Sequence, residues 1–366
     1  MKTKVCHVSI LHHRYDIRIF HKECVTLSNL NYEVSLIVCD DLANEIINDV
    51  SIYSVGKYKN KLERFLQYQN KIWLQIRSIH PDIVHFHDPE LVFLGAKLVK
   101  LGYKVIYDVH EDLPKQIMYK YWIPKLIRRP LSIIAKLIEH FYIKKFNGVI
   151  TSTSIIKNRV KKYNSIVSSI ANYPLLEEVN LSRIVDKEDA ICYIGSISRS
   201  RGIVPLVESL EISKIKLKLA GVFSGDICLE EIKKLPGGEY VEYLGVLNRS
   251  QISQLLNTVK VGIVTLLPTP SYIESMPIKM FEYMMFKIPI VASNFIFWKE
   301  LLADNCCGLF VNPNDKIEIA TACNFLINNE SESRIMGLNG YNAIIKKYNW
   351  EKESNKLKDF YIEINR

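Results

Sequence analysis

The sequence lacks the motifs that mark several large classes of proteins. It contains no Gly-x-Gly-x-x-Gly segment, which argues against a nicotinamide or flavin dehydrogenase, and no Gly-Lys-Ser/Thr segment of a P-loop. It has no Asp-x-Asp pair of the kind that holds a divalent cation, and no Cys-x-x-Cys pair. Its eight cysteines are scattered, which fits reduced, buried thiols better than disulfides or zinc ligands.

Long apolar runs are also missing. Lys or Arg interrupts the longest apolar stretches within about ten residues, so we expect no transmembrane helix. The first residues lead directly into a strand-like pattern, without the apolar core and small-residue cleavage site of a signal peptide. These features predict an intracellular, cytoplasmic protein.

Positive charge is concentrated in the first half of the chain. Residues 1–172 hold 26 Lys and Arg against 15 Asp and Glu, a net charge of +11, whereas residues 173–366 hold 22 against 24, a net charge of −2. Segment 115–145 carries eight basic residues and one acid among large apolar side chains that include Tyr121 and Trp122. This segment predicts contact with an anionic membrane surface, although an ordinary helix with a basic outer face would read the same. Nucleic acid is disfavoured because no recognised nucleic-acid motif accompanies the charge.

Short β-branched runs alternate with helix-like segments along the whole chain, a pattern typical of parallel βαβ units. Two such sets, separated near residues 172–174, predict an α/β protein with two doubly wound, Rossmann-like domains facing a cleft. We expect domains at 1–172 and 173–349, with 350–366 as a helix that packs back on the first domain. The expected strands are 5–11, 34–39, 83–86, 105–109 and 149–151, then 191–195, 217–222, 241–246, 261–267, 290–293 and 308–311.

Ligands of such sheets bind beyond the carboxyl ends of the strands, so polar residues at those positions are candidates. Segment 12–23 is dense in His, Arg and Lys; it either grips an anionic or hydroxyl-rich ligand or forms a capped helix start with a cationic face. His87 and His110 follow two later strands, where a histidine can hydrogen-bond a reacting group, although a structural role is commoner for any single histidine. The chain has no His-x-x-x-His or Glu-x-x-His spacing, which argues against a metal site.

Glu274 and Glu282, eight positions apart after the run 261–267, are the most informative pair. Eight residues make a little over two helical turns, so both carboxylates can face one side of a helix and its leading loop. A helix N-terminus there would suit a phosphate, while the acids could hold a ribose diol and a sugar hydroxyl. A solvated amphipathic helix is the alternative. In the turn 196–202, Arg199 and Arg201 could cradle a diphosphate or lie on a basic surface turn.

Taken in order, these segments resemble the retaining, two-domain GT-B glycosyltransferases of family 4, over nearly the whole chain. The missing Asp-x-Asp pair separates the chain from single-domain, metal-dependent sugar transferases. Between the two glutamates, Ser-Met-Pro-Ile-Lys replaces the more usual Gly-Phe-Gly-Leu-Pro and is similar to a bacterial surface-polysaccharide branch. The other matching segments are Arg-x-Asp-x-Arg-Ile-Phe-x-Lys-Glu at 14–23, Asp-Ile-Val-His-Phe-His-Asp at 82–88, the strand ending in His110, Asn-Tyr-Pro at 172–174, 195–202, Leu-Gly-Val at 244–246, and Lys-Ile-Pro-Ile-Val-Ala-Ser at 287–293.

The resemblance implies a sugar nucleotide bound mainly by the second domain, with no cofactor and no required metal. Glu282 would hold the ribose hydroxyls, and Glu274 the donor sugar near its reacting carbon. Arg201, assisted by Arg199, would neutralise the diphosphate, and His110 would approach the donor sugar. Further donor contacts would come from Gly245, Val246, Ser275, Met276, Pro277, Ile278 and Lys279, and the acceptor side from Arg14, Asp16, Arg18, Lys22, His87 and Asp88.

The reaction that the resemblance implies is transfer of a sugar, with retention, to a lipid-diphosphate-linked glycan in capsule, exopolysaccharide or O-antigen assembly. It would take place at the inner face of the cytoplasmic membrane, and the positive first domain suits both an anionic acceptor and an anionic membrane surface. Three alternatives stay open. They are a sugar-nucleotide epimerase or hydrolase on the same architecture, a catalytically silent nucleotide-binding partner subunit, and, more distantly, a nicotinamide oxidoreductase.

Overall fold

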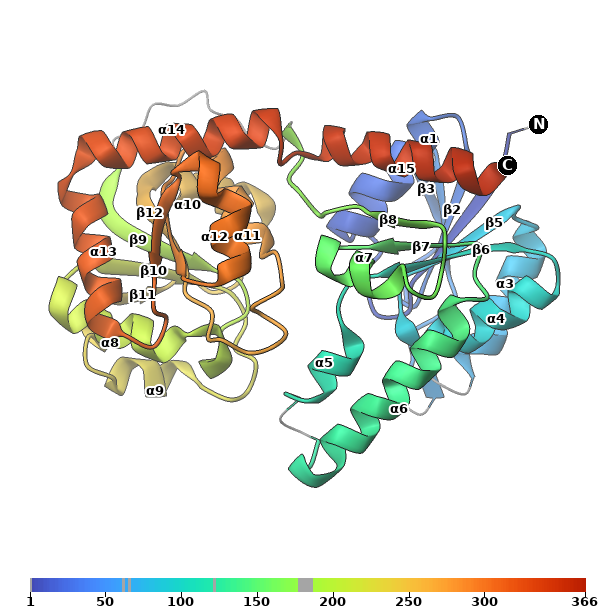
Figure 1. Ribbon diagram of the computed structural model, residues 1–366, viewed down its shortest axis with the longest axis horizontal. Helices are drawn as coiled ribbons and strands as arrows, with labels where there is room; N and C mark the ends of the chain where they lie inside the picture. Colours follow the sequence, from blue (N-terminus) through green and yellow to red (C-terminus); the bar gives the residue numbers. More distant parts are fainter. Residues whose placement is uncertain (1, 61–62, 65–66, 121–122, 177–186) are drawn as a thin grey trace. The chain divides into compact units, whose positions relative to one another are not determined.

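The chain folds into two units. The N-terminal unit comprises residues 1–172 and 350–366, and the C-terminal unit comprises residues 173–349. The computed structural model describes residues 2–60, 63–64, 67–120, 123–176 and 187–366 (Figure 1). Tyr121 and Trp122, which belong to the basic segment, lie outside the described residues. The unit boundary falls in the Asn-Tyr-Pro linker.

The N-terminal unit is built on an eight-stranded sheet in the order β3-β4-β2-β1-β5-β6-β7-β8. All neighbouring pairs are parallel except β3 with β4. The order in which successive strands are added to the sheet reverses between the parallel neighbours β1 and β5. The loops that follow these two strands therefore diverge and leave room for side chains beyond the sheet edge. The strands are β1 (Lys4–Val8), β2 (Glu33–Val38), β3 (Glu45–Ile47), β4 (Val50–Ser54), β5 (Ile83–Phe86), β6 (Lys104–Val109), β7 (Gly148–Thr151) and β8 (Val167–Ser169).

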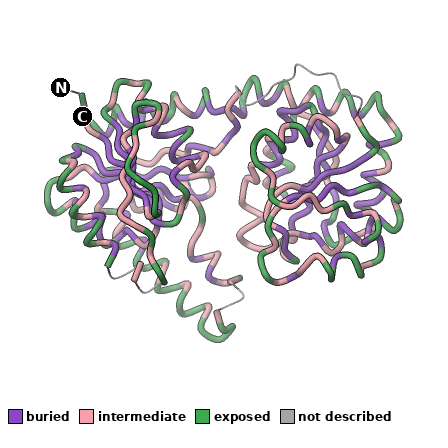
Figure 2. Tube along the Cα trace, turned by 180° about the vertical axis from the view of Figure 1, so that it is seen from behind, coloured by how far each residue is buried: buried purple, intermediate pink, exposed green. Residues whose placement is uncertain are grey.

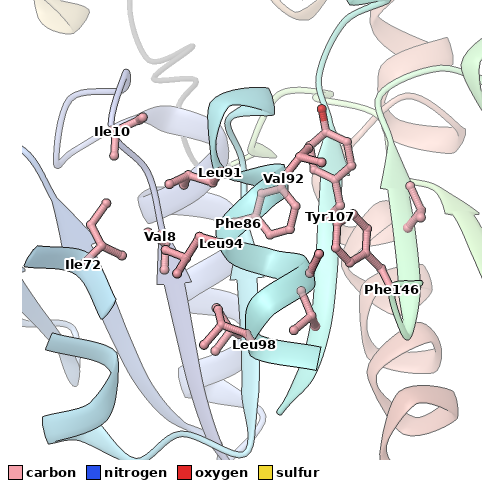
Figure 3. Close-up of a cluster of buried hydrophobic side chains, with 14 of the residues drawn as sticks. Val8, Ile10, Ile72, Phe86, Leu91, Val92, Leu94, Leu98, Tyr107 and Phe146 are labelled. Carbon is pink, nitrogen blue, oxygen red and sulfur yellow. The ribbon is translucent and has the colours of Figure 1, made fainter. Parts of the chain in front are cut away.

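Helices cover both faces of this sheet (Figure 1). They are η1 (Ile17–Cys24, a π-helical segment), α1 (Val25–Asn29), α3 (Tyr68–Ile79), η2 (Pro89–Leu91), α4 (Val92–Lys100), α5 (Leu113–Ile117), α6 (Lys125–Ile143), α7 (Ser154–Val160) and the C-terminal α15 (Trp350–Asn365). One core cluster lies between the sheet and α3 and α4; Phe86 and Tyr107 stack there with ring centroids 4.6 Å apart (Figure 3).

The C-terminal helix belongs to the N-terminal unit because three of its side chains are anchored there. Trp350 donates from its indole nitrogen to the Thr26 hydroxyl (2.9 Å), and Glu353 accepts from the Ala171 amide (2.8 Å). Tyr361 is fully buried. Burial of this apolar and aromatic face holds α15 in place.

The C-terminal unit contains a six-stranded, wholly parallel sheet in the order β11-β10-β9-β12-β13-β14. Taken in chain order this is 3-2-1-4-5-6, the dinucleotide-fold arrangement, with its reversal between β9 and β12. The strands are β9 (Glu188–Ile194), β10 (Lys216–Ala220), β11 (Val241–Tyr243), β12 (Val259–Val264), β13 (Ile290–Ser293) and β14 (Gly308–Val311). The helices are η4 (Arg199–Arg201), α8 (Ile203–Ser213), α9 (Leu229–Lys234), η5 (Gly238–Tyr240), α10 (Arg249–Thr258), α11 (Ile278–Met285), α12 (Ile296–Leu302), η6 (Ala303–Asn305), α13 (Lys316–Asn328) and α14 (Glu330–Lys346).

The two doubly wound sheets confirm the fold class, and the strands expected from apolar runs are all present. Three short strands, β3, β4 and β8, were not expected. They carry alternating or polar sequences, such as Glu-Ile-Ile and Val-Ser-Ser, because they lie at or near sheet edges and are only partly buried. No helix in the described part of the chain has the length and apolarity needed to cross a bilayer.

Two glycines allow close packing near β9 and β12, the switch point at which the strand order of the C-terminal sheet reverses. At Gly262 on β12, an added Cβ would lie 2.2 Å from the Tyr283 ring, so glycine lets α11 pack directly on the strand. At Gly202 the backbone is left-handed (φ +74°), and an added Cβ would lie 1.8 Å from the Thr265 carbonyl oxygen. Glycine at this position therefore lets the turn holding Arg201 approach the loop after β12.

We expect Gly262→Ala to destabilise the protein by roughly 1–3 kcal/mol, because the new methyl group must displace the buried Tyr283 ring. Calorimetric unfolding would measure this as a lower Tm. Gly340→Ala on α14 is the comparison: an added Cβ there would lie 3.1 Å from Met284 Cγ, a much smaller overlap, so the Tm should fall less than for Gly262→Ala. Equal Tm values for Gly262→Ala and the wild type would contradict this account of the packing.

Candidate active site

In the N-terminal unit, Asp108 at the end of β6 organises the polar residues beyond the sheet edge. It accepts two hydrogen bonds from Arg18, at 2.8 and 3.0 Å. Its Oδ2 also lies 3.0 Å from His110 Nε2 and 3.3 Å from His87 Nδ1. Burial acts to raise the pKa of Asp108, but the charges of Arg18 and His110 and the histidine hydrogen bonds hold it well below its usual range. Asp108 is therefore a buried carboxylate that orients the two predicted histidines.

Asp88, just after β5, is a second buried carboxylate at this edge. It accepts from the Ser9 hydroxyl (2.9 Å) and the Ile10 amide (2.6 Å), and His12 Nδ1 lies 3.3 Å away. Burial would raise the pKa of Asp88, but the His12 hydrogen bond and charge lower it below its usual value. The His12 ring lies 5.0 Å from that of His110, so three histidines gather where the loops after β1, β5 and β6 meet.

Arg14 and Asp16, both predicted on the acceptor side, are engaged within the unit. The buried Arg14 guanidinium donates to both Asp40 oxygens (2.7 and 2.6 Å), to the Ala43 carbonyl and to Glu45. Asp16 caps the start of η1 by accepting from the amides of residues 18 and 19, both at 2.9 Å. These partners occupy the Arg14 guanidinium and Asp16 Oδ1, and the predicted acceptor contacts of the two residues stay predictions.

Arg18 and Lys22 are also buried and paired. Besides Asp108, Arg18 donates to the Ile170 carbonyl (2.9 Å), and Lys22 donates from Nζ to Asn172 Oδ1 (2.6 Å). The cationic segment 12–23 is therefore largely neutralised inside the N-terminal unit. The geometry of Arg14, Arg18 and Lys22 lends no support to the prediction that they contact a ligand.

In the C-terminal unit, the turn after β9 and the loop after β12 lie side by side, joined by a hydrogen bond from the Leu267 amide to the Ser200 carbonyl (3.1 Å). Arg201 is partly exposed here, with its guanidinium 5.7 Å from the centroid of the Tyr272 ring. Arg199 instead points to the acidic surface of α9, where it donates to Glu231 (2.5 Å) and to the Asp226 carbonyl (3.0 Å). Of the two predicted arginines, only Arg201 faces the loop that holds the glutamate pair.

Lys279, in the first turn of α11, is a buried cation without a hydrogen-bond acceptor. Its Nζ lies 3.4 Å from the centroid of the Tyr193 ring and has no hydrogen-bond partner within the described part of the chain. Burial, and secondly the charge of Arg201, lowers the pKa of Lys279 well below its usual range. The Lys279 amine and the Arg201 guanidinium thus lie beside the helix start, where an anion bound between them would stabilise the charged form of Lys279.

The two glutamates lie on either side of the start of α11. Glu282 is on the helix and accepts from Arg249 (2.6 Å), whereas Glu274 is in the preceding turn. Pro277 precedes the helix and provides no side-chain cap, which leaves the first amides of α11 available to an anion.

The sequence predicts that residues 275–279 contact the sugar nucleotide, and their backbone amides could make these contacts. Two of these amides cannot donate to a ligand. The Ser275 amide donates to the Tyr272 carbonyl (3.1 Å), and Pro277 has no N–H. The Ser275 carbonyl also accepts from the Trp298 indole (2.7 Å), which fixes the turn. The amides of Met276, Ile278 and Lys279 therefore remain as candidates, and Met276 Sδ is 3.8 Å from the Tyr173 hydroxyl.

Gly245 and Val246 form the turn after β11. The Gly245 carbonyl accepts from the Gly221 amide (2.8 Å), and the Val246 side chain is exposed. Gly245 has a left-handed backbone (φ +71°) with open space where a side chain would point. Their predicted contact with the donor stays a prediction.

Sequence reasoning did not assign roles to five residues that shape these sites: Asp108, His12, Tyr193, Tyr272 and Arg249. Asp108 and Tyr193 lie on apolar strands, where they read as core positions, and Arg249 opens a polar helix. In the sequence, only the basic residues elsewhere in the unit could have indicated that Asp108 accepts hydrogen bonds. Contact of an aromatic ring with a cation depends on tertiary structure that residue spacing does not reveal.

Family comparisons agree with this geometry. Residues 18–170 match the family described as Glycosyltransferase Family 4, and residues 177–343 match Glycosyl transferases group 1. The two-unit fold and these two matches identify the chain as a member of the GT-B glycosyltransferase family. The chain belongs to the group 1, family 4 type of these enzymes.

Two curated relatives are similar to the chain. One is the Arabidopsis thaliana sulfoquinovosyl transferase SQD2, 23% identical over 321 residues, which cover 82% of this chain and 60% of the relative. The other is an uncharacterized 41.2 kDa protein in the cps region of Klebsiella pneumoniae, 24% identical over 249 residues, which cover 64% of this chain and 66% of the relative. The chain thus spans about two thirds or less of the length of these relatives.

Solved structures share the fold along the whole chain. The sucrose-phosphate synthase from Thermosynechococcus elongatus has a TM-score of 0.80 at 15% identity, with 99% of each chain covered. The Anabaena protein HepE, in complex with UDP-glucose, has a TM-score of 0.72 at 12% identity, with 98% of this chain and 99% of HepE covered. At such identities the likeness establishes the fold.

We expect Lys279→Met to raise the Tm of the ligand-free protein by a few degrees, because it removes an unpartnered buried amine at similar volume. Since the pKa of Lys279 is lowered on folding, the unfolded chain binds more protons, and wild-type stability rises with pH toward the usual Lys value of 10.5. The Tm difference should therefore shrink between pH 7 and pH 9.5. The surface variant Lys316→Met is the control; a lower Tm for Lys279→Met at pH 7 would contradict the argument.

Proposed function

We propose that this glycosyltransferase moves a sugar, with retention of anomeric configuration, from a nucleotide-diphosphate sugar to a lipid-diphosphate-linked glycan of a bacterial surface polysaccharide such as capsule, exopolysaccharide or O-antigen. The observation that carries the donor assignment is the pair Arg201 and Lys279 beside the open N-terminus of α11, at the switch point of the C-terminal sheet. A diphosphate supplies the negative charge that this arrangement lacks.

Each part of the donor has a partner in the C-terminal unit. Glu282 accepts hydrogen bonds from the ribose hydroxyls, which replace Arg249 as its partner. Glu274 accepts a hydrogen bond from a hydroxyl of the donor sugar. When the bond to the sugar breaks, charge develops on the diphosphate. Arg201, Lys279 and the α11 amides stabilise that charge, so transfer requires no metal ion. The complex of the similarly folded HepE with UDP-glucose supports a donor of this class.

His110 is proposed to contact the donor sugar from the N-terminal unit. Its Nε2 is held 3.0 Å from Asp108, so the carboxylate fixes the orientation of the ring. His87 and Asp88 lie at the same sheet edge and contribute to the acceptor side. Because both are buried, they act by orienting His110 and His12 rather than by presenting their own side chains to solvent.

Helix α6 is the surface that we propose binds an anionic membrane at the cytoplasmic face. It is long and largely exposed; Leu126 is 94% accessible and Leu137 63%. Its other exposed apolar residues are Ile127, Leu131, Ile133, Ile134, Ile138 and Phe141. In Figure 2 this helix is mostly green and pink, the colours of exposed and intermediate residues.

Basic residues accompany the apolar ones on α6. Arg129 and Lys136 are exposed on the helix, and Lys144 and Lys145 follow it. Apolar side chains that insert at the level of the headgroups, flanked by cations, are the combination that binds anionic bilayers. Such binding would bring the enzyme to a lipid-linked acceptor. The similarity to a sulfoquinovosyl transferase and to a protein in a cps region supports a role in sugar transfer.

We expect the wild type to bind one nucleoside diphosphate at micromolar affinity in a calorimetric panel of UDP, GDP, ADP and CMP. Arg201→Ala and Glu282→Ala should each weaken this binding by about 10- to 100-fold, because each removes a charge-assisted hydrogen bond of roughly 1.5–3 kcal/mol. Glu231→Ala, which removes only the surface partner of Arg199, is the matched control. Folded protein that binds no nucleotide would overturn the donor assignment, and free sugar or an epimer formed without acceptor would indicate a hydrolase or epimerase.

Leu126→Glu combined with Leu137→Glu should abolish flotation with vesicles that contain phosphatidylglycerol, because charged side chains oppose insertion. Wild-type binding should be weak on phosphatidylcholine vesicles and should fall in roughly 0.5 M salt, where surface charges are screened. Leu74→Glu on α3, an exposed apolar position elsewhere in the unit, is the control and should leave flotation unchanged. Equal flotation of the double variant and the wild type would refute α6 as the membrane surface.

A further inference from the structure

Beneath the sheet edge of the N-terminal unit lies a cluster of four buried titratable side chains, of which the proposed transfer reaction uses only His87, to orient His110. His7 is on β1, His85 is on β5, His87 follows β5, and Glu23 is on η1. All four side chains are inaccessible to solvent. One potential ligand atom from each lies within 4.8 Å of those from the other three.

The Glu23 carboxylate is the least satisfied group in this cluster. Both of its oxygens are fully buried, and neither has a hydrogen-bond partner among the residues that the structure describes. Oε2 is 4.0 Å from a ring nitrogen of His7, of His85 and of His87, too far for a hydrogen bond to any of them. Arg18 Nε lies 3.1 Å from Oε1, but without hydrogen-bond geometry. A buried carboxylate left in this way is costly unless a further positive group completes its surroundings.

We propose that His7, Glu23, His85 and His87 hold a divalent transition-metal ion, with Zn²⁺ the best fit to three imidazoles and one carboxylate. Bonds of about 2.0–2.2 Å in a tetrahedral site place ligand atoms about 3.3 Å from one another. The distance from His7 Nδ1 to His87 Nε2 is 3.0 Å, and those from the three nitrogens to Glu23 Oε2 are 4.0 Å. These separations bracket the tetrahedral value.

The surroundings of the rings match those of metal-binding histidines, whose second nitrogen usually meets a carboxylate or another acceptor. His87 Nδ1 lies 3.3 Å from Asp108 Oδ2, which leaves Nε2 for the ion. His7 Nε2 lies 3.4 Å from the Tyr361 hydroxyl, which leaves Nδ1. His85 is the exception: its Nδ1 lies 2.8 Å from the same hydroxyl, and its Nε2 has no hydrogen-bond partner among the described residues. His85 would therefore exchange its contact with Tyr361 for the ion.

The charge of the cluster also suits a cation. Burial lowers the pKa values of His7 and His85 well below their usual range, and the neutral imidazole is the form that binds metals. Burial, together with the charge of Asp108, raises the pKa of Glu23, and the charge of Arg18 acts in the opposite direction, as a bound cation would. A divalent ion supplies positive charge at the centre of the cluster.

The proposed site is structural rather than catalytic. Four protein ligands close it, and its buried position leaves no place for a substrate. It would fasten η1 to β1 and β5 and, through Tyr361, α15 to the sheet. The proposal is independent of the transfer reaction and of its need for metal. Ligands at positions 7, 23, 85 and 87 fit no short metal-binding motif, which is why residue spacing predicted no metal.

The test is metal analysis of the full-length protein, purified without a metal-affinity column, stripped with a chelator, loaded with Zn²⁺ and dialysed. We expect one Zn²⁺ per chain by plasma mass spectrometry and a higher Tm than the stripped protein. Glu23→Gln keeps the shape of the side chain and should reduce Zn²⁺ affinity by more than the roughly 10- to 100-fold typical of losing an outer-shell partner. Absence of stoichiometric Zn²⁺ in the wild type, or unchanged affinity in folded Glu23→Gln, would overturn the proposal.

Two controls locate the ion. Cys306→Ser removes the exposed thiol and should leave Zn²⁺ binding unchanged. His110→Ala tests the neighbouring group His87, Asp108 and His110, which could also hold a cation; loss of Zn²⁺ in this variant alone would refute the proposed ligand set. If Glu23→Gln does not fold, the Co²⁺-loaded wild type decides. Visible d–d absorption of a tetrahedral site without a thiolate charge-transfer band supports three histidines and a carboxylate, and a thiolate band or an octahedral spectrum overturns them.

Discussion

Parallel strand order is the constraint on which both candidate sites depend. In a parallel sheet every strand ends at the same edge, so residues far apart in sequence gather there without any local motif. In the N-terminal unit this brings His12, Asp88 and His110 together from the loops after β1, β5 and β6. In the C-terminal unit it sets the turn with Arg201 against the loop after β12. The reversal of strand order in each sheet decides where these loops part.

The two units differ in whether their buried cationic side chains are paired with acids. In the N-terminal unit the cations are paired: Arg18 with Asp108, and Arg14 with Asp40 and Glu45. Buried ion pairs of this sort fix geometry more than they add stability, because desolvation offsets most of their attraction. In the C-terminal unit Lys279 is buried against an aromatic ring, with Arg201 as a like-charged neighbour and Glu282 as an oppositely charged one. That contrast is why we propose the anion site in the C-terminal unit.

The sequence was a good guide to the fold and a partial guide to the sites. Strands such as β5 and β13 could be predicted because full burial on both faces demands continuous apolar runs. The edge strand β3 could not, because it is only partly buried and reads as a polar loop. Arg201 and Arg199 looked equivalent in sequence, yet Asp226 and Glu231 hold Arg199 on the surface. Whether a charged side chain is free or paired depends on residues that only the fold brings near.

The same reasoning explains why the buried histidine cluster escaped notice. A strand residue such as His7 is flanked by Cys6 and Val8 and reads as part of an apolar core, and Glu23 reads as the polar face of a helix. Only the fold shows that Glu23 faces inward with three imidazoles around it. Protonation could neutralise the carboxylate and let it share a hydrogen bond with Asp108, but each nearby ring nitrogen is 4.0 Å from Oε2, too far for a hydrogen bond. A metal ion satisfies the carboxylate and the rings together, because a single central ion requires ligand atoms that are close to one another but not in contact.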